Sequence, residues 1–566
     1  GDTIVYQIID DDGLGYVGPG GVGNFENQID AWLRSTDIGA LVDGNPVQDG
    51  ANAWIDQTGN GIDAYQSVAD NQPIYWENEA NWNNRPVIEF DREGSDFLEI
   101  ADNDRMNTAP GPQNQRTIIV AFRPANNISD QQTIYEEGGG ARGLTIYIMD
   151  DSLYIGGWNH PDDQGDDDPS TPWDNDGDDV GDFIYVSKEI SANTPYFAIL
   201  QFDFDEEAVG TVSGYLNGEY LGVLQGAGRL YPHGGDIGLG SQNQGACYHD
   251  GNCPGGTTYY FDGYISEFIS GNIVFNDAQL KLVNNYLAAQ YNVSIPASQD
   301  LYDYHVGHGY EVFGIGQDNI VESHYISQGQ GIIKIDNPTA AGNGKYCLIG
   351  NDGADIDAWE DYTDIDVPGN EANVERVNRE WRVDKQTGDL GNIDVSVEVG
   401  RLPAISFGFS KYILLVDKDD DGGDFTDCTT MYELSNAGGG YYKASDVDFS
   451  KGDYFTIGIA NPTVEFASAT SSGFEPDTIV DFIVKMNFIT ASDYTFDYAT
   501  SAGTATAGDD FISTSGSFTI SAGTQQDTIE VEIENDTDVE NDEDFTMELS
   551  NTEDEPEIGD VSVHTF

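Results

Sequence analysis

Basic residues are scarce in this sequence. Its 566 residues include 22 Lys and Arg against 101 Asp and Glu, which gives a formal net charge of -79 at pH 7. A chain of this charge repels nucleic acid phosphates and anionic lipid surfaces, so the composition argues strongly against binding to either. Such acidity is typical of a solvated surface suited to salty water. Where the acids cluster, it also indicates calcium (Ca²⁺), which takes oxygen ligands.

Long apolar runs are also missing. The longest, such as YILLV at 412–416, fall far short of the ~20 residues that cross a bilayer. The sequence has no initiator methionine and no signal peptide. We therefore expect a processed protein or a piece of a longer one.

Cysteine is rare, with four residues. Cys247 and Cys253 lie in the segment ACYHDGNCPGG, and Cys347 and Cys428 lie on segments that look like neighbouring strands. We predict a disulfide for each pair, which indicates an oxidising compartment and an extracellular, cell-surface or secreted protein. A metal site built from Cys247, His249 and Cys253 is the alternative for the first pair, although no fourth ligand is evident.

Helical periodicity is confined to one segment. Elsewhere, short alternating runs such as TIIVAFRP (117–124) and LTIYIM (144–149) are separated by Gly, Asn and Asp turns, which predicts β-strands. In residues 275–293, apolar residues recur at helical spacing after an N-cap at Asn276. A chain of this length forms about three to five domains. The sequence therefore predicts an all-β, multidomain chain of β-sandwiches with one helix closing the first of them.

Two stretches carry ordered motifs. In the first domain, residues 24–296, the segments AWLRSTDIG, AWIDQTGNGIDAYQ, NRPVIEFDREGSDFLEI and FDGYISEFI follow GPGGVGN and lead into the predicted helix. This set resembles a laminin-G or concanavalin-like jelly roll of the sort found in Bacteroidetes surface proteins. Residues 297–462, with YEVFGIGQDN, YCLIGND and VNREWRV, resemble the β-sandwich that often follows it in such adhesins.

The last domain, residues 463–566, carries the most specific motif. Its segments FDYATSAGTATAGDDF and IENDTDVENDEDFTMELSN resemble a Calx-β domain, an immunoglobulin-like sandwich that binds calcium at one end. The resemblance implies the calcium ligands Glu475, Asp510, Asp536, Asp538, Glu540 and Glu543, with Asp538 contributing mainly through its backbone carbonyl. Calcium needs about six to eight oxygens, which several adjacent loops can supply together. The alternative is that these acids only solvate loops.

The two ends of the chain resemble each other. The opening GDTIVYQIIDDD looks like the last strand of a preceding Calx-β unit with its terminal acids, Asp10, Asp11 and Asp12, and residues 1–23 would be that strand with a linker. The closing IGDVSVHTF looks like the first part of the same strand, without its acidic run. We therefore expect a tandem array whose adjacent copies are joined covalently or by strand addition.

Two further acidic clusters have spacing that suits calcium. Asp417, Asp419 and Asp421 alternate before Gly422 as in the first half of an EF-hand loop, but Cys428 stands where the bidentate Glu belongs. An acidic hairpin turn explains this segment equally well.

The second cluster lies in a long insertion of the first domain, residues 158–183. It contains Asp174, Asp176 and Asp178, and Trp158 and Trp173 flank it. An aromatic ring beside a calcium loop can stack on the apolar face of a sugar while carboxylates hold its hydroxyls. A solvated acidic loop between core tryptophans is the alternative.

Catalysis receives little support from the sequence. Glu89, Asp91 and Glu93 resemble the carboxylate triplet of concanavalin-like glycosidases, but on a strand Glu89 and Glu93 lie about 13 Å apart at Cα, whereas a retaining pair needs carboxyls about 5 Å apart. We therefore expect a non-enzymatic, calcium-stabilised repeat of a giant extracellular adhesin or surface filament. Its partners would be adjacent copies and glycans or cell-surface polymers. The alternative is a secreted protein that binds or hydrolyses polysaccharide.

Overall fold

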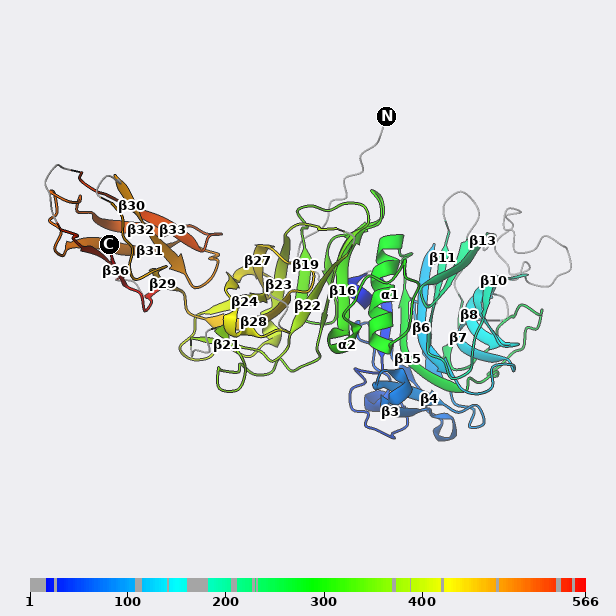
Figure 1. Ribbon diagram of the computed structural model, residues 1–566. Helices are drawn as coiled ribbons and strands as arrows, with labels where there is room; N and C mark the ends of the chain where they lie inside the picture. The colour runs from blue at the N-terminus through cyan, green and yellow to red at the C-terminus, as the bar shows by residue number, and fades with distance from the viewer. Residues whose placement is uncertain are drawn as a thin grey trace, which may run out of the picture. The chain divides into compact units, whose positions relative to one another are not determined.

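The computed structural model confirms an all-β chain with several antiparallel sheets (Figure 1). It describes residues 17–24, 28–106, 114–139, 142–159, 182–204, 211–225, 230, 233–368, 373–386, 388–418, 422–474, 478–535, 541–551 and 555–566. The chain divides into two compact units, Gly1–Gly331 with Gly342–Leu348, and Ile332–Ala341 with Ile349–Phe566.

The first unit is built on two packed sheets. The eight-stranded sheet has the order β13-β12-β11-β6-β15-β4-β3, with β1 also paired to β15, and the seven-stranded sheet has the order β10-β9-β8-β7-β14-β5-β2. The strands of the first sheet are β1 (Ile29–Arg34), β3 (Ile74–Glu79), β4 (Arg85–Phe90), β6 (Gln115–Pro124), β11 (Tyr196–Asp203), β12 (Thr211–Leu216), β13 (Glu219–Gln225) and β15 (Gly263–Gly271). Those of the second are β2 (Ala64–Tyr65), β5 (Leu98–Ile100), β7 (Gln132–Gly138), β8 (Arg142–Met149), β9 (Ser152–Asn159), β10 (Asp182–Glu189) and β14 (Ile237–Leu239).

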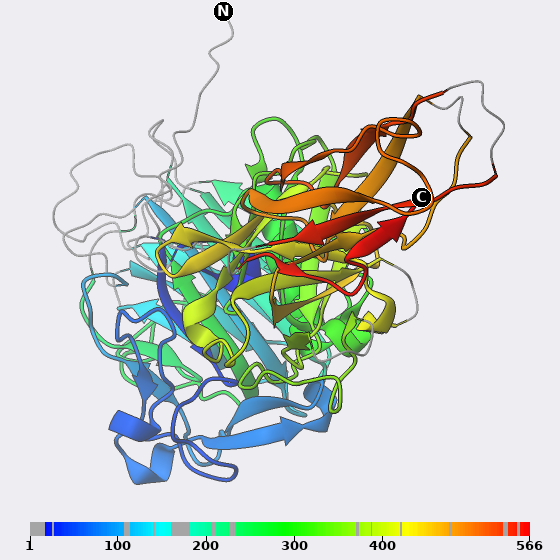
Figure 2. The same cartoon turned by 90° about the vertical axis from the view of Figure 1, so that its left-hand side faces the viewer.

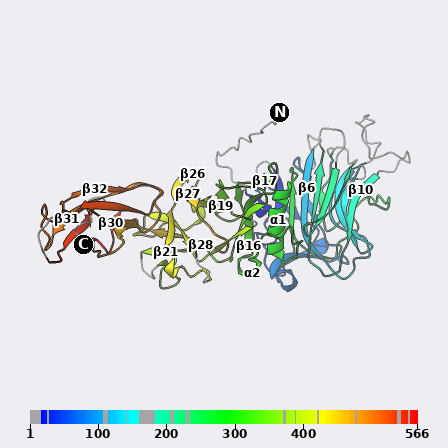
Figure 3. The same cartoon turned by 45° about the horizontal axis from the view of Figure 1, so that its top comes forward.

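Helix α1 (Asp277–Tyr291) covers the outer face of the first sheet and lies between β6 and β16 (Tyr310–Gln317) in Figure 1 and Figure 3. A capping box begins it, because Gln279 N donates to Asn276 Oδ1 (3.0 Å) and Asn276 N donates to Gln279 Oε1 (3.1 Å). The predicted closing helix and its cap are thus confirmed. Also in this unit are α2 (His305–His308), β17 (Ser323–His324), β18 (Ser327–Gln328) and most of β20 (Lys345–Asn351).

A buried carboxylate holds α1 on the sheet. Glu267 of β15 accepts from Trp32 Nε1 (2.5 Å), and from the hydroxyls of Tyr286 (2.8 Å) and Tyr291 (2.6 Å) on the helix. Burial raises the pKa of Glu267, which these donors and the charge of Arg34 oppose. Since a buried acceptor without donors is costly, this set of bonds fixes how the helix lies on the sheet.

The second unit contains another pair of sheets. Among the strands of this unit, one sheet has the order β22-β28-β24-β25 with β21 also on β28, and the other has the order β19-β23-β27-β26. The strands are β19 (Ile333–Asp336), β21 (Val374–Arg376), β22 (Trp381–Gln386), β23 (Ile393–Glu398), β24 (Lys411–Asp417), β25 (Thr430–Glu433), β26 (Ser435–Gly438), β27 (Tyr441–Val447) and β28 (Tyr454–Ala460). Short 3-10 helices are η1 (Pro19–Gly21), η2 (Gly50–Asn52), η3 (Ala69–Asn71) and η4 (Ala80–Trp82) in the first unit, and η6 (Val399–Arg401) and η7 (Phe425–Asp427) in the second.

The end of the chain forms a separate sandwich, drawn in orange and red in Figure 2. Its sheets have the orders β33-β30-β29-β35 and β32-β31-β34-β36. The strands are β29 (Thr463–Phe466), β30 (Ile479–Met486), β31 (Tyr494–Ala502), β32 (Ser515–Ile520), β33 (Gln526–Glu532), β34 (Phe545–Ser550), β35 (Glu557–Ile558) and β36 (Val563–Thr565). Along β30, the buried residues Val480, Phe482 and Val484 alternate with more exposed ones, as a sheet with one face on the core requires.

Candidate metal centre

Two loops meet at one end of the C-terminal sandwich because two phenylalanines stack in its core. Phe511 follows the loop after β31, and Phe545 begins β34. Both are buried, and their rings lie 4.2 Å apart at their centroids with only 10° between their planes. Asp510 directly precedes Phe511, and Glu543 and Asp544 directly precede Phe545. The stacked rings therefore bring acidic residues from both loops together.

Hydrogen bonds within the loops hold the acids in place. Asp510 Oδ2 accepts from Thr506 N (2.6 Å), and Asp510 O accepts from Glu534 N (2.9 Å). The Oδ1 atom of Asp544 accepts from Thr504 N (3.1 Å) and from the Thr504 hydroxyl. A Cβ at Gly503 would lie 2.5 Å from the carbonyl oxygen of Asp544, so this close approach of the two loops requires glycine.

The carboxylates repel one another at this point. The pKa of Glu543 is raised by desolvation, by its hydrogen bond with Asp510 and by the charges of Asp510 and Asp544. Within the described residues, no Lys, Arg or His forms an ion pair with any of these three acids. Oxygen donors that converge without a counter-charge fit the needs of calcium.

The structure thus brings together two of the predicted calcium ligands, Asp510 and Glu543. The others, Glu475, Asp536, Asp538 and Glu540, lie outside the described residues, as do Asp10, Asp11 and Asp12. The sequence prediction did not include Asp544. A repeated pattern could have found it, since an acidic pair precedes each of the stacked rings, Asp509-Asp510 before Phe511 and Glu543-Asp544 before Phe545.

The other two acidic clusters stay predictions. Asp417 is the last residue of β24, is buried, and pairs with Tyr454 of β28. Asp419 and Asp421, which would complete that loop, lie outside the described residues, as do Trp173, Asp174, Asp176 and Asp178 of the insertion.

Trp158 corrects one expectation. Its side chain is 1% exposed, packs against Tyr147, Cys247 and Tyr248, and donates from Nε1 to Gly139 O (2.8 Å). A ring in this position has no free face for a sugar. The prediction that Trp158 stacks on a ligand is therefore wrong, and the residue belongs to the core.

One of the two predicted disulfides is confirmed and the other is wrong. Cys247 and Cys253 form the predicted disulfide, which rules out the alternative metal site because neither sulfur is a free thiolate. Cys347 and Cys428 do not form one, and both are buried thiols. Their segments are not neighbouring strands: β25, which follows Cys428, lies at the end of its sheet and pairs with β24. Instead, Cys428, which directly follows η7, contacts the carbonyl oxygen of Val416 on β24 through Sγ at 3.3 Å.

Comparison with known proteins agrees with the C-terminal geometry. Residues 460–565 match the Calx-beta domain, and residues 279–453 match a domain of unknown function (DUF8202). No curated protein matches the chain. None of the described helices is long and apolar enough to cross a membrane.

Three solved structures are similar to parts of the chain. An apo-form Calx CBD1 domain is 23% identical, with 19% of this chain and 93% of that chain covered and a TM-score of 0.18. The calcium binding domain CBD12 of CALX1.1 is 22% identical, with 18% and 43% covered and a TM-score of 0.18, so this chain spans less than half of it. Domain 4 of an extracellular arabinanase from Geobacillus stearothermophilus, solved with arabinotriose, is 12% identical, with 45% and 98% covered and a TM-score of 0.27. Residues 460–565 of this chain form a Calx-beta type β-sandwich domain.

Proposed function

We propose that this chain is a non-enzymatic, calcium-stabilised binding segment of a larger extracellular adhesin or surface filament. One observation carries the proposal: Asp510 and Glu543 converge from two loops of a Calx-beta type sandwich without a basic partner in the described residues. The Cys247–Cys253 disulfide supports an oxidising compartment, where millimolar calcium is available to modules of this kind.

Asp510 and Glu543 would hold the ion, which supplies the positive charge that the two loops lack. The predicted ligands Glu475, Asp536, Asp538 and Glu540 lie outside the described residues, and we assign them to the same site, which needs about six to eight oxygens. Because the loops lead directly into the stacked Phe511 and Phe545, calcium would fasten the end of the sandwich to its core. A module stiffened in this way suits a filament that carries binding domains away from a cell.

Direct binding tests this role. Calorimetric titration of the full chain with calcium should reveal a site with a Kd of about 0.1–1 mM. Asp510→Asn should abolish it or weaken it at least ~10-fold, because a charged ligand is replaced by a neutral one. Glu548→Gln is the matched control: Glu548 lies on β34, is exposed, and is set in the middle of a strand. Equal calcium binding by all three proteins would refute the proposal.

A hydrolytic role has less support. Both oxygens of Glu89 are engaged, with Oε2 accepting from Trp76 Nε1 (2.7 Å) and Oε1 accepting from the Tyr264 hydroxyl (3.0 Å). A general acid or nucleophile needs an oxygen that faces the scissile bond. A reducing-sugar assay on soluble polysaccharides should therefore show no release. Release that Glu89→Gln abolishes would establish an enzyme.

Adjacent copies of the same unit are the proposed partners in the array. The support is the resemblance between residues 1–12 and a terminal Calx-β strand, and these residues lie outside the described part of the chain. A synthetic peptide of residues 4–12 should bind the chain and raise its melting temperature in calcium. A peptide with its three aspartates changed to asparagine serves as the control, and equal binding of both would contradict the proposal.

A further inference from the structure

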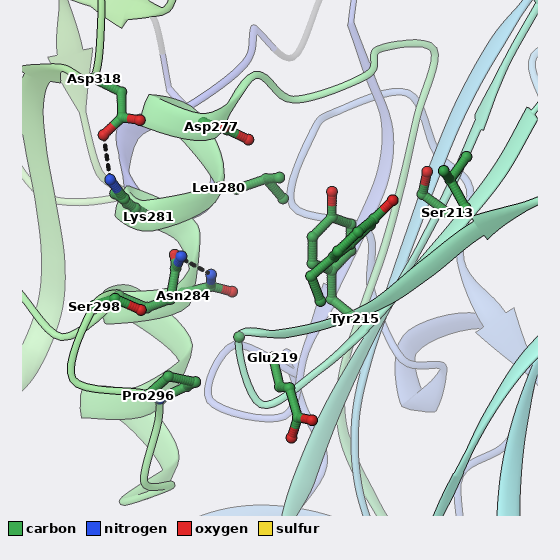
Figure 4. Close-up of a pocket in the computed structure, with 14 residues that line it drawn as sticks. Ser213, Tyr215, Glu219, Asp277, Leu280, Lys281, Asn284, Pro296, Ser298 and Asp318 are labelled. Carbon is green, nitrogen blue, oxygen red and sulfur yellow. Dashed lines mark hydrogen bonds and ion pairs between the residues drawn. The ribbon is translucent and has the colours of Figure 1, made fainter.

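A groove in the first unit lies between the β12–β13 hairpin and helix α1 (Figure 4). Its volume is about 750 Å³, within the range of small-molecule sites. Tyr215 and Glu219 of the hairpin form one wall, and the opposite wall comes from α1 and from residues 296–299, which follow the helix. The groove has no part in the calcium centre, which lies in the second unit.

The hairpin wall is aromatic. Tyr215 and Tyr220 are cross-strand partners on one face, and their ring centroids lie 5.2 Å apart. The turn between the strands is Asn217-Gly218, both with positive φ (49° and 73°), which is the turn that gives a two-residue hairpin its tight twist. Tyr220 is 53% exposed and lines the groove, so part of its ring is open to a ligand. The hairpin therefore offers two adjacent rings to a ligand in the groove.

The helix wall is polar and contains an unsatisfied acceptor. Asn284 is 1% exposed and lines the groove, and its Nδ2 donates to Gln299 Oε1 (3.2 Å). Its Oδ1 has no hydrogen-bond partner among the described residues. A buried acceptor left in this state costs about 1–3 kcal/mol. A hydroxyl group of a bound ligand is the donor that would satisfy it.

The charged residues of the groove exclude one class of ligand. The groove carries the carboxylates of Glu219, Asp277 and Asp318, while its nearby lysines are already paired, Lys188 with Glu219 (2.8 Å) and Lys281 with Asp318. The three carboxylates outnumber the two lysines, so an anionic ligand would meet a net negative charge. Burial and the charge of Asp277 raise the pKa of Tyr215 to about 12, so its hydroxyl keeps its proton at physiological pH.

A cation is not needed in this groove. Ligand oxygens of Asp277, Asp318 and Glu322 lie within 4.8 Å of one another. However, Lys281 and the Tyr346 hydroxyl (3.2 Å) already contact Asp318. The ammonium group supplies the positive charge that a metal ion would otherwise bring, so we treat this cluster as an ion-pair network.

We propose that the groove binds a short segment of a neutral polysaccharide, independently of calcium. The rings of Tyr215 and Tyr220 stack on the apolar C–H faces of adjacent sugar rings, and the Asn284 amide oxygen accepts from a sugar hydroxyl. The carboxylates at the rim accept from other hydroxyls. This assignment names the ligand class and the site for the binding role proposed above, and it rests on that role but not on the calcium centre.

Affinity electrophoresis of the full chain tests it, with mixed-linkage β-glucan, xyloglucan and galactomannan as neutral polymers, and alginate and polygalacturonate as acidic ones. At least one neutral polymer should retard the chain, and the acidic polymers should not. Tyr220→Ala should weaken the retardation by about 10-fold, because it removes one stacking surface from an exposed position. Asn284→Ala should weaken it as well. Tyr362→Ala is the matched control, since Tyr362 is 44% exposed and lies in the second unit.

Retardation should be the same in calcium and in a chelator. Failure of every neutral polymer to retard the wild-type chain would overturn the inference, as would equal retardation of the wild type and Tyr220→Ala, or retardation by the acidic polymers alone. Calcium titration of the same samples distinguishes the two proposals. If the chain binds calcium but no neutral polymer, the calcium proposal stands and the groove proposal is refuted. Tyr220→Ala keeps the test valid if Asn284→Ala fails to fold.

Discussion

Replacing Asp510 with Asn separates the calcium role of this residue from its structural role. Asn keeps an oxygen that can accept from Thr506 N, now 2.6 Å from Asp510 Oδ2, and it leaves the stacked Phe511 unchanged. What it removes is the negative charge beside Glu543. The substitution should therefore lower the melting temperature in calcium but not in its absence.

The size of the effect follows from ligand linkage. At about 10 mM calcium, a site with a Kd of about 0.1–1 mM stabilises the folded state by about 1.4–2.7 kcal/mol. If the substitution weakens binding ~10-fold, about 1 kcal/mol of this is lost. For a domain of about 100 residues, that corresponds to a melting temperature lower by ~4–8 °C. In a chelator, the same change relieves repulsion between Asp510 and Glu543, so the melting temperature should stay the same or rise.

Differential scanning calorimetry is the suitable assay, because none of the eight tryptophans of the chain lies within residues 460–565 and their fluorescence does not report on this domain. Glu548→Gln should change the melting temperature equally in calcium and in chelator. A wild-type transition that calcium leaves unmoved would refute the reasoning. So would an Asp510→Asn protein destabilised by the same amount in both conditions.

Three further predictions concern other parts of the chain. Burial outweighs Arg376 and raises the pKa of Glu380 to about 7, so its stabilising contribution is present below about pH 4.5 and is lost as pH rises through 7. Glu380→Gln should therefore reduce the fall in unfolding free energy between pH 5 and pH 8 by roughly 2–3 kcal/mol in urea titrations, and an unchanged fall would contradict this. Phe511→Leu should lower calcium affinity in calorimetric titration, because it loosens the loop that carries Asp510. Unaltered affinity would show that the stacked rings do not position the calcium ligands. Cys253→Ser should cost about 2 kcal/mol in urea unfolding of the first unit, because it opens a short disulfide loop, and an unchanged midpoint would show that the loop is held by other contacts.

Local patterns in the sequence predicted the features that depend on neighbouring residues. The helix in residues 275–293 was recognisable because apolar residues recur at helical spacing directly after the N-cap Asn276, both of which are local features. The Cys247–Cys253 disulfide closes a short loop, so no knowledge of the fold was needed to pair them. The strands predicted from TIIVAFRP (117–124) and LTIYIM (144–149) correspond to β6 and β8, because their pattern is local to each segment.

Features that depend on the order of strands were not predictable in this way. Cys347 and Cys428 both follow or occupy strand-like segments, but strand pairing depends on long-range contacts that a single sequence does not contain. Trp158 flanks an acidic insertion, which favoured a binding role. The opposite outcome arose because its side chain points to a small aromatic core formed with Tyr147 and Tyr248.

The two candidate sites differ in how much of each the sequence could show. At the calcium centre, the acids directly precede Phe511 and Phe545, so the core packing that every sandwich needs also positions the ligands, and the motif is visible in the sequence. In the groove, Tyr215 and Tyr220 look like ordinary hairpin residues, and Asn284 looks like a polar position on a helix. Only the docking of α1 on its sheet, fixed by the buried Glu267, places the amide opposite the rings.

A change that loosens this docking, such as Glu267→Gln, should therefore weaken polysaccharide binding in affinity electrophoresis while calcium binding in the second unit stays unchanged. A loss of both would show that the two units do not fold independently.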